Sequence, residues 1–329
     1  MTNNVDSIFV AAFDDRYLIP HHIIPFILNT TKYCDLNFIT PKRYLKIDKN
    51  IKLNSKHKLN LINPSKLPKY DITKRLFNKF FVNYSTNNSY FERACFHRWF
   101  ALNASTTHLK SDQVICLLDT DFLIGMNPKE ILSDCVSYSN NRNLQFIAEW
   151  DEHNQGVIGP EITLMTKSYL FDFCKFLLTK YYSTEMRSNL LSEYFDRIGK
   201  GLYGGICDMR ALSNYAKNYK DKIFNLRKLN SRYLIRNFNS FLNENIEIPN
   251  WKISIKEKKQ ILYLSDSSRD LIGIHFQGDA KFHMDLILKN KELTHKSVIK
   301  NNKSVKVNFK KKINRFFNLI NLFIKTFTK

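Results

Sequence analysis

The segment VICLLDTDFLIG, residues 114–125, restricts the fold of this chain more than any other feature, because it sets two carboxylates, Asp119 and Asp121, inside an otherwise apolar run. The apolar residues 114–118 predict a buried strand that ends at Asp119. Two ionised acids left unpaired at the end of a core strand repel each other and lose hydration, at a cost on the order of several kcal/mol. A divalent cation held by oxygen ligands would compensate that cost.

The other segments alternate between strand-like and helical patterns, which predicts an α/β fold. Loops with short elements are expected over 42–70, and a Gly/Pro break is expected at 155–160. The predicted strands are 7–13, 35–40, 114–118, 144–150, 246–255 and 261–265, and the predicted helices begin at or near residues 16, 89, 127, 167, 186 and 207. Ligands of such sheets bind at the carboxyl ends of the strands, where Asp119 and Asp121 lie.

Composition agrees with a folded globule rather than with disorder, since 43% of the 329 residues are apolar and 14% are aromatic. No secretory signal and no apolar run of membrane-spanning length is recognised. The six cysteines are scattered without the paired spacing of a zinc or redox site, which favours small core residues in a reducing cytosol.

Two further segments carry residue types suited to a nucleotide diphosphate. In AAFDDRYL, the backbone and the carboxylates of Asp14 and Asp15 are suited to hydrogen-bond a base or ribose. In HFQGDAK, His275 supplies an imidazole for a metal, Gly278 lets the backbone approach a phosphate, and Lys281 supplies a fixed positive charge. A lone D-x-D is weak evidence, and the duller alternative is a strand end whose acids cap a neighbouring helix.

The order FDDRY, then DTD, then H-x-x-G-x-x-K resembles the glycosyltransferases of the GT-A fold, and is most similar to the retaining family 8 type. This resemblance implies a Rossmann-like α/β domain with a mixed central sheet over residues 1–289, with a nucleotide-binding part at 1–121 and an acceptor part with the closing motif at 122–289. It further implies that Mn²⁺ or Mg²⁺ binds the two acids and the imidazole, that Gly278 and Lys281 hold the diphosphate of a UDP-sugar, and that Ala12, Asp14 and Arg16 lie near the uridine.

The chain departs from the family pattern at two places. Phe282 and His283 follow the lysine where the family has Pro-Trp, and the acidic pair expected near the reacting sugar falls at GICDM, where only Asp208 is acidic. Retention and inversion of configuration therefore both stay open.

A carboxylate is needed beside the oxocarbenium-like centre, and it would act as general base if the reaction inverts. Asp208 is the first candidate and Asp151 and Glu152 the second, while the alternative for Asp208 is to cap the following helix. Arg93 or Arg98 is a candidate for contact with the donor sugar or phosphate, and the alternative for Arg98 is an ordinary salt bridge. Trp99 is expected to be ordinary packing.

The last forty residues, 290–329, form a separate basic tail that carries ten of the 21 net positive charges. Its end, KKKINRFFNLINLFIKTFTK, gathers apolar side chains on one helical face, which favours a helix lying on an anionic membrane surface. The rival is a helix docked on the body or on a partner.

The sequence as a whole favours a metal-dependent hexosyltransferase that extends a bacterial lipopolysaccharide, capsule or related lipid-linked saccharide, peripheral on the cytoplasmic face of the inner membrane. A basic nucleic-acid-binding protein is the rival suggested by the pI of about 9.6. No nucleic-acid module is recognised, so no nucleic-acid partner is expected. A nucleotidyltransferase would also use paired aspartates, but the Gly-rich phosphate loop usual in that class is missing from VAAFDDRYL.

Overall fold

The computed structural model describes residues 8–294, apart from 17–18, 46, 48–55, 142, 152–156, 203, 230–232, 240–251, 257–260, 265–269, 278–280, 282–283 and 285–291. The predicted tail helix, Gly278 and Glu152 thus lie outside the described residues. No helix in the described part of the chain is long and apolar enough to cross a membrane.

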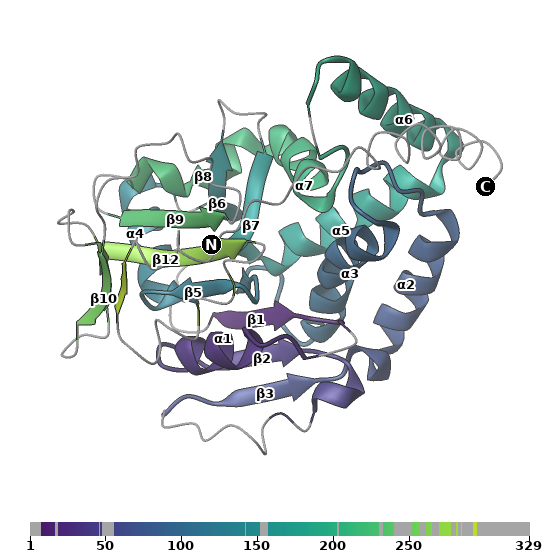
Figure 1. Ribbon diagram of the computed structural model, residues 1–329. Coiled ribbons are helices and arrows are strands. Elements are labelled where there is room, and N and C mark those ends of the chain that lie inside the picture. Colours follow the sequence, from purple (N-terminus) through teal and green to yellow (C-terminus); the bar gives the residue numbers. More distant parts are fainter. Residues whose placement is uncertain are drawn as a thin grey trace.

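The larger sheet has seven strands and mixes parallel with antiparallel pairs: β1 (Phe9–Phe13), β2 (Leu36–Ile39), β3 (Leu59–Ile62), β4 (Val114–Leu118), β6 (Phe146–Asp151), β7 (Val157–Thr166) and β8 (Ile223–Asn225). Their order is β3-β2-β1-β4-β7-β6-β8 (Figure 1). Strand β1 is parallel to β2 and β4, whereas β7 is antiparallel to both β4 and β6. The predicted α/β class with a mixed central sheet is confirmed.

A second sheet of six strands lies beside the first and supplies the other half of the candidate site: β5 (Phe122–Ile124), β9 (Tyr233–Asn239), β10 (Lys252–Lys256), β11 (Ile261–Leu264), β12 (Asp270–Gln277) and β13 (Glu292–Thr294). Strand β12 pairs with β5 on one side and with β9 on the other. Because β4 belongs to the first sheet and β5 to the second, the D-x-D segment lies where the chain passes between the two sheets. Strand β13 falls within residues 290–329, which were predicted as tail.

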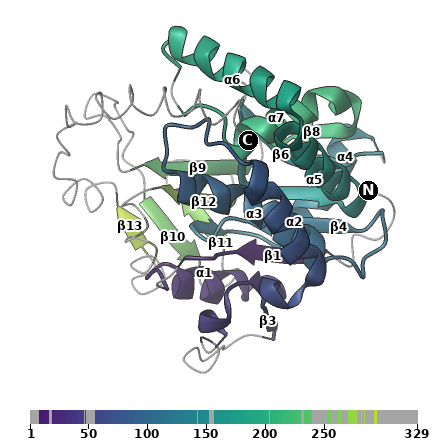
Figure 2. The ribbon, with the colours of Figure 1, turned by 90° about the vertical axis from the view of Figure 1, so that its right-hand side faces the viewer.

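The helices are α1 (Ile23–Thr30), α2 (Pro68–Phe80), α3 (Ser89–Ser105), α4 (Pro128–Ser139), α5 (Lys167–Tyr182), α6 (Thr184–Gly199) and α7 (Asp208–Ala216), with short 3-10 turns η1 (Lys42–Tyr44), η3 (Pro64–Lys66), η4 (Lys217–Lys222) and η5 (Leu226–Leu229). Helices α2, α3 and α5 lie together on one side of the larger sheet (Figures 1 and 2). Residues of β4 alternate between the two faces: Cys116 and Leu118 pack with α1 and α4, and Ile115 and Leu117 pack with α3 and α5.

Local sequence signals account for several of these boundaries. Helix α3 occupies the predicted range, and its N-cap Asn88 accepts a hydrogen bond from the backbone N–H of Phe91. Asn127 likewise caps α4 by accepting from the backbone N–H of Lys129, with Pro128 in the first turn, as predicted.

Three expectations about elements were wrong. Helix α1 begins at Ile23 rather than near residue 16, because Asp14 and Arg16 bond to each other across a turn. Helix α2 occupies the end of the region expected to be loop. The expected break at 155–160 is instead crossed by β7, since a bulge against β6 accommodates Pro160.

Candidate active site

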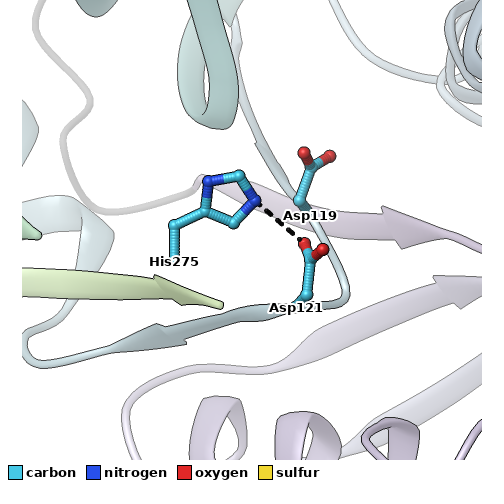
Figure 3. A group of neighbouring side chains, drawn as sticks. All are labelled: Asp119, Asp121 and His275. Atoms are coloured by element: carbon cyan, nitrogen blue, oxygen red, sulfur yellow. Dashed lines mark ion pairs between the residues drawn. The ribbon is translucent and has the colours of Figure 1, made fainter. Parts of the chain in front are cut away.

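His275, which is far from Asp119 and Asp121 in the sequence, is brought beside them by one strand pairing. Asp119 follows β4, and its backbone N–H donates to the Glu161 carbonyl at 3.0 Å. Asp121 precedes β5, and its carbonyl accepts from the Phe276 N–H at 2.8 Å. The antiparallel register of β5 and β12 sets His275 opposite Phe122, so the imidazole projects toward the two acids (Figure 3).

Glycine at position 273 makes this close pairing of β12 and β5 possible. A Cβ atom built on Gly273 would lie 2.3 Å from the Phe122 ring and 2.6 Å from the Leu123 carbonyl oxygen. Any side chain would therefore push the two strands apart, two residues away from His275. The register that delivers the imidazole depends on this glycine.

One ligand atom from each of Asp119, Asp121 and His275 lies within 4.8 Å of the other two. Ligand atoms that surround a single divalent cation at about 2.0–2.6 Å are separated by at most about twice that distance, so the three groups fit one ion. Two carboxylates and an imidazole are donors that Mn²⁺ accepts, and the carboxylates suit Mg²⁺. The three predicted metal ligands thus form a candidate metal site.

Protein charges balance Asp121 in this arrangement. His275 Nε2 lies 3.3 Å and Lys281 Nζ 2.7 Å from its two carboxylate oxygens. Burial acts to raise the pKa of Asp121, but these partners outweigh it and hold the pKa well below the ordinary value. Burial would likewise lower the pKa of His275, yet the hydrogen bond and charge of Asp121 raise it to about 9. A bound divalent cation would replace the positive charge that His275 supplies to Asp121.

Asp119 is balanced by Arg98 of α3, which also reaches Asp208 at the start of α7. Arg98 Nη1 donates to Asp119 Oδ1 at 2.5 Å, and Nε donates to Asp208 Oδ2 at 2.9 Å. Trp99, which is fully buried, donates its indole N–H to the same Asp208 oxygen at 2.9 Å. Arg98 therefore links the candidate metal site to the first candidate for the catalytic carboxylate.

These contacts bear on the alternative in which Asp208 caps its own helix. Asp208 is 2% exposed, and its carboxylate faces α3. The N-cap of α7 is Cys207, whose side chain makes no capping hydrogen bond. The contacts found here thus join Asp208 to α3 instead of capping its own helix. Trp99 packs in the core as expected, and it also orients Asp208.

Of the three residues predicted to lie near the uridine, two line the cavity described below and one does not. Asp14 is buried and paired with Arg16, whose backbone N–H donates to Asp14 Oδ1 at 2.9 Å and whose Nη2 donates to Thr120 at 3.3 Å. Both side chains line the cavity described below. Ala12 is fully buried within β1 and is not among the described residues that line it.

Arg93 and Asp151, two further candidates, are not brought into the cavity by the described contacts. Arg93 Nε donates to the Ser89 carbonyl at 3.3 Å on its own helix, and the residue is not among those lining the cavity. Asp151 ends β6, where only its backbone is described.

A cavity of about 570 Å³ opens beside these residues, a size typical of ligand sites. Among the described residues, eight carboxylates line it against four lysine and arginine side chains, although the whole chain carries a net charge of +21. The acids are Asp14, Asp15, Glu92, Asp119, Asp121, Glu149, Glu161 and Asp208, and the basic residues are Arg16, Arg98, Arg227 and Lys281.

Sequence reasoning missed the three glutamates of this cavity. Burial raises the pKa of Glu92 and of Glu161 to about 7. Glu149 pairs with Arg227, whose Nε lies 2.9 Å from Oε1. An acid inside the apolar run VIGPEITLM is the same signal that marked Asp119, and it would have identified Glu161.

No protein-family model and no curated protein matches the chain. Among solved structures, mouse xyloside xylosyltransferase 1 in its apo form is 10% identical with a TM-score of 0.48, over 71% of this chain and 88% of that one. The galactosyltransferase LgtC, in complex with donor and acceptor sugar analogues, is 8% identical with a TM-score of 0.43, over 93% and 100%. The apo structure of the bifunctional glycosyltransferase WbbM is 12% identical with a TM-score of 0.46, over 92% and 53%. At these low identities and TM-scores the function has to be argued from the site itself.

Proposed function

We propose that this protein is a metal-dependent glycosyltransferase that transfers a hexose from a UDP-sugar to a surface-glycan acceptor. The observation that supports this most directly is the convergence of Asp119, Asp121 and His275, with Lys281 on the same carboxylate, at the edge of a ligand-sized cavity. Two acids, an imidazole and a lysine in one place suit a cation with a bound diphosphate.

Each residue has a chemical task in this proposal. The two aspartates and His275 would hold Mn²⁺ or Mg²⁺, which supplies positive charge for the phosphates as the sugar departs. Lys281 would move from Asp121 to a phosphate oxygen, because a cation at Asp121 would compete with the ammonium group. Asp14 and Arg16 would contact the uridine, and Gly278 the diphosphate.

Asp208 is proposed as the carboxylate near the reacting carbon. Arg98 and Trp99 both donate to its Oδ2, so its orientation is set before substrate arrives. A carboxylate held in this way is suited to stabilise an oxocarbenium-like centre if the reaction retains configuration. In an inverting reaction Asp208, or alternatively Asp151 or Glu152, would take the proton of the acceptor hydroxyl.

The charge of the cavity argues against the nucleic-acid-binding alternative. A nucleic-acid groove follows the phosphate backbone with lysine and arginine, whereas the described lining of this cavity has twice as many acids as lysines and arginines. Acidic side chains instead suit a metal ion and sugar hydroxyls. The basic tail is proposed to hold the enzyme on the cytoplasmic face of a bacterial inner membrane, where a lipid-linked saccharide acceptor would be presented.

A thermal-shift screen of nucleotides and nucleotide sugars, with and without Mn²⁺, tests the proposal. Ligand at about 100 times its Kd should stabilise the wild type by about 2.7 kcal/mol, a shift of several degrees that requires Mn²⁺. Asp121→Asn and His275→Ala should lose this shift, while the matched control Asp172→Asn, an exposed aspartate on α5, should keep it. Equal shifts in all four proteins, or none with any UDP compound, would refute the metal-dependent donor site.

A further inference from the structure

Glu161 on β7 lines the cavity, and the proposed reaction leaves it without a task. The residue is 4% exposed, so its carboxyl is removed from bulk water. An acid buried in this way needs a compensating partner, because an unpaired buried carboxylate is costly.

A bulge in the sheet sets the position of Glu161. In the pairing of β6 with β7, Ala148 lies opposite Thr163 and the next residue, Glu149, lies opposite Gly159. Three residues of β7, Pro160, Glu161 and Ile162, therefore lie between two pairs that are consecutive on β6. Bulges of this kind redirect side chains and are frequent beside active sites.

The other edge of β7 ties Glu161 to the candidate metal site. Leu118 of β4 lies opposite Ile162, and the Asp119 N–H donates to the Glu161 carbonyl at 3.0 Å. Neighbours across an antiparallel pair project to the same face, so the side chains of Glu161 and Asp119 share one face of the sheet. Glu161 thus lies immediately beside the groups that would hold the cation and diphosphate.

The neighbouring Gly159 supplies the space that the carboxyl occupies. A Cβ atom at position 159 would lie 2.2 Å from Glu161 Oε2 and 2.6 Å from Oε1. The carboxyl therefore lies along β7 over the glycine, and both residues line the cavity.

Several of the surrounding acids form ion pairs with lysine or arginine, whereas the opposite charge that acts on Glu161 is that of His275. Asp119 and Asp208 share Arg98, Asp121 pairs with Lys281, and Glu149 pairs with Arg227. Within the described part of the chain, no lysine or arginine forms an ion pair with Glu161. Its carboxyl oxygens are therefore acceptors that a hydroxyl-bearing ligand in the cavity can reach without breaking an ion pair to a described lysine or arginine.

We propose that Glu161 binds hydroxyl groups of the transferred sugar and so selects the donor. This proposal rests on the proposed glycosyltransferase function. The transferred sugar, rather than the acceptor, is the occupant because it is bonded to the diphosphate, and Glu161 adjoins the groups that would hold the diphosphate. A neutral sugar with free hydroxyls can form hydrogen bonds with this carboxyl group.

The test compares Glu161→Gln and Glu161→Ala with the wild type and with a matched control, Thr163→Val. Thr163 is fully buried two residues along the same strand, and it does not line the cavity. Isothermal titration calorimetry with UDP and Mn²⁺ measures nucleotide binding. Steady-state kinetics measures kcat/KM for UDP-glucose, UDP-galactose, UDP-N-acetylglucosamine and UDP-glucuronate. Circular dichroism checks folding, and the isosteric Gln variant covers the case in which the Ala variant is misfolded.

The expected result is UDP affinity within twofold of wild type in both Glu161 variants, together with a roughly 10- to 100-fold loss of kcat/KM for the preferred donor. With the deoxy analogue that lacks the bonded hydroxyl, wild type and Glu161→Ala should become nearly equal, since the contact is already absent. Thr163→Val should behave as wild type in every assay.

Three outcomes would overturn the inference. The first is an unchanged kcat/KM in both Glu161 variants. The second is a loss of affinity for UDP alone that is as large as the loss of kcat/KM. The third is the same ratio of wild-type to variant kcat/KM with every deoxy donor. Each of these leaves UDP binding by the wild type intact, and thus leaves the proposed function standing. Failure of the wild type to bind UDP with Mn²⁺ would instead remove the proposed function and this inference together.

Discussion

Replacement of Arg98 by methionine should destabilise the protein strongly, because Arg98 joins the buried Asp208 to the partly buried Asp119. Its side chain is 12% exposed, and the side chains of its partners Asp119 and Asp208 are 19% and 2% exposed. Loss of one member of a buried ion pair costs about 3–5 kcal/mol, since the remaining charge is left without a partner. Methionine has a similar length and is apolar, so the change removes the charge and donors while preserving most of the packing.

Urea denaturation followed by circular dichroism measures this change, and two variants control for its cause. Arg75→Met breaks an exposed ion pair with Asp71 and should change the free energy of unfolding by less than about 1 kcal/mol. The double variant Arg98→Met with Asp208→Asn removes one of the two stranded charges, and it should recover part of the lost stability. A loss below about 1 kcal/mol for Arg98→Met, or strict additivity in the double variant, would refute the bridging role.

Three further predictions concern the strand pairing, one buried acid and the tail. Gly273→Ala should destabilise the protein by about 1–3 kcal/mol, measured by urea denaturation, and abolish Mn²⁺-dependent stabilisation, because the new methyl group meets Phe122 and the Leu123 carbonyl. Burial raises the pKa of Glu92 from 4.5 to about 7, so the stability that Glu92 contributes is present at low pH and is lost as the pH rises through that interval. Between pH 5 and 8, the free energy of unfolding of Glu92→Gln, measured by urea denaturation, should therefore rise by up to about 3 kcal/mol relative to wild type. Truncation after Thr294, which keeps β13, should abolish co-sedimentation with anionic vesicles, and undiminished binding would reject the membrane role of the tail.

Sequence motifs identified the residues of the candidate metal site because each belongs to a short pattern with its own chemical meaning. An acid in an apolar run, as at Asp119 and Asp121, signals a compensating partner wherever the strand is placed. The same kind of signal is present at Glu161, but Gly159 and Pro160 just before it favour a break in the chain over a strand.

Boundaries set by local hydrogen bonds were also predictable. Asn127 with Pro128 marks the start of α4, since the capping bond involves residues two apart in sequence. The start of α1 was not predicted, because the ion pair of Asp14 with Arg16 competes with helix formation there.

Contacts between distant segments could be decided only by the tertiary structure. The link from Arg98 to both Asp119 and Asp208 joins positions 21 and 110 residues apart, and it requires α3 to pack beside the ends of β4 and α7. The placement of Glu161 requires a bulge whose register depends on two neighbouring strands at once. The sequence by itself thus determined which side chains demand a partner, whereas the packing of helices and the register of strands decided which partner each one meets, because that choice depends on geometry summed over the whole core.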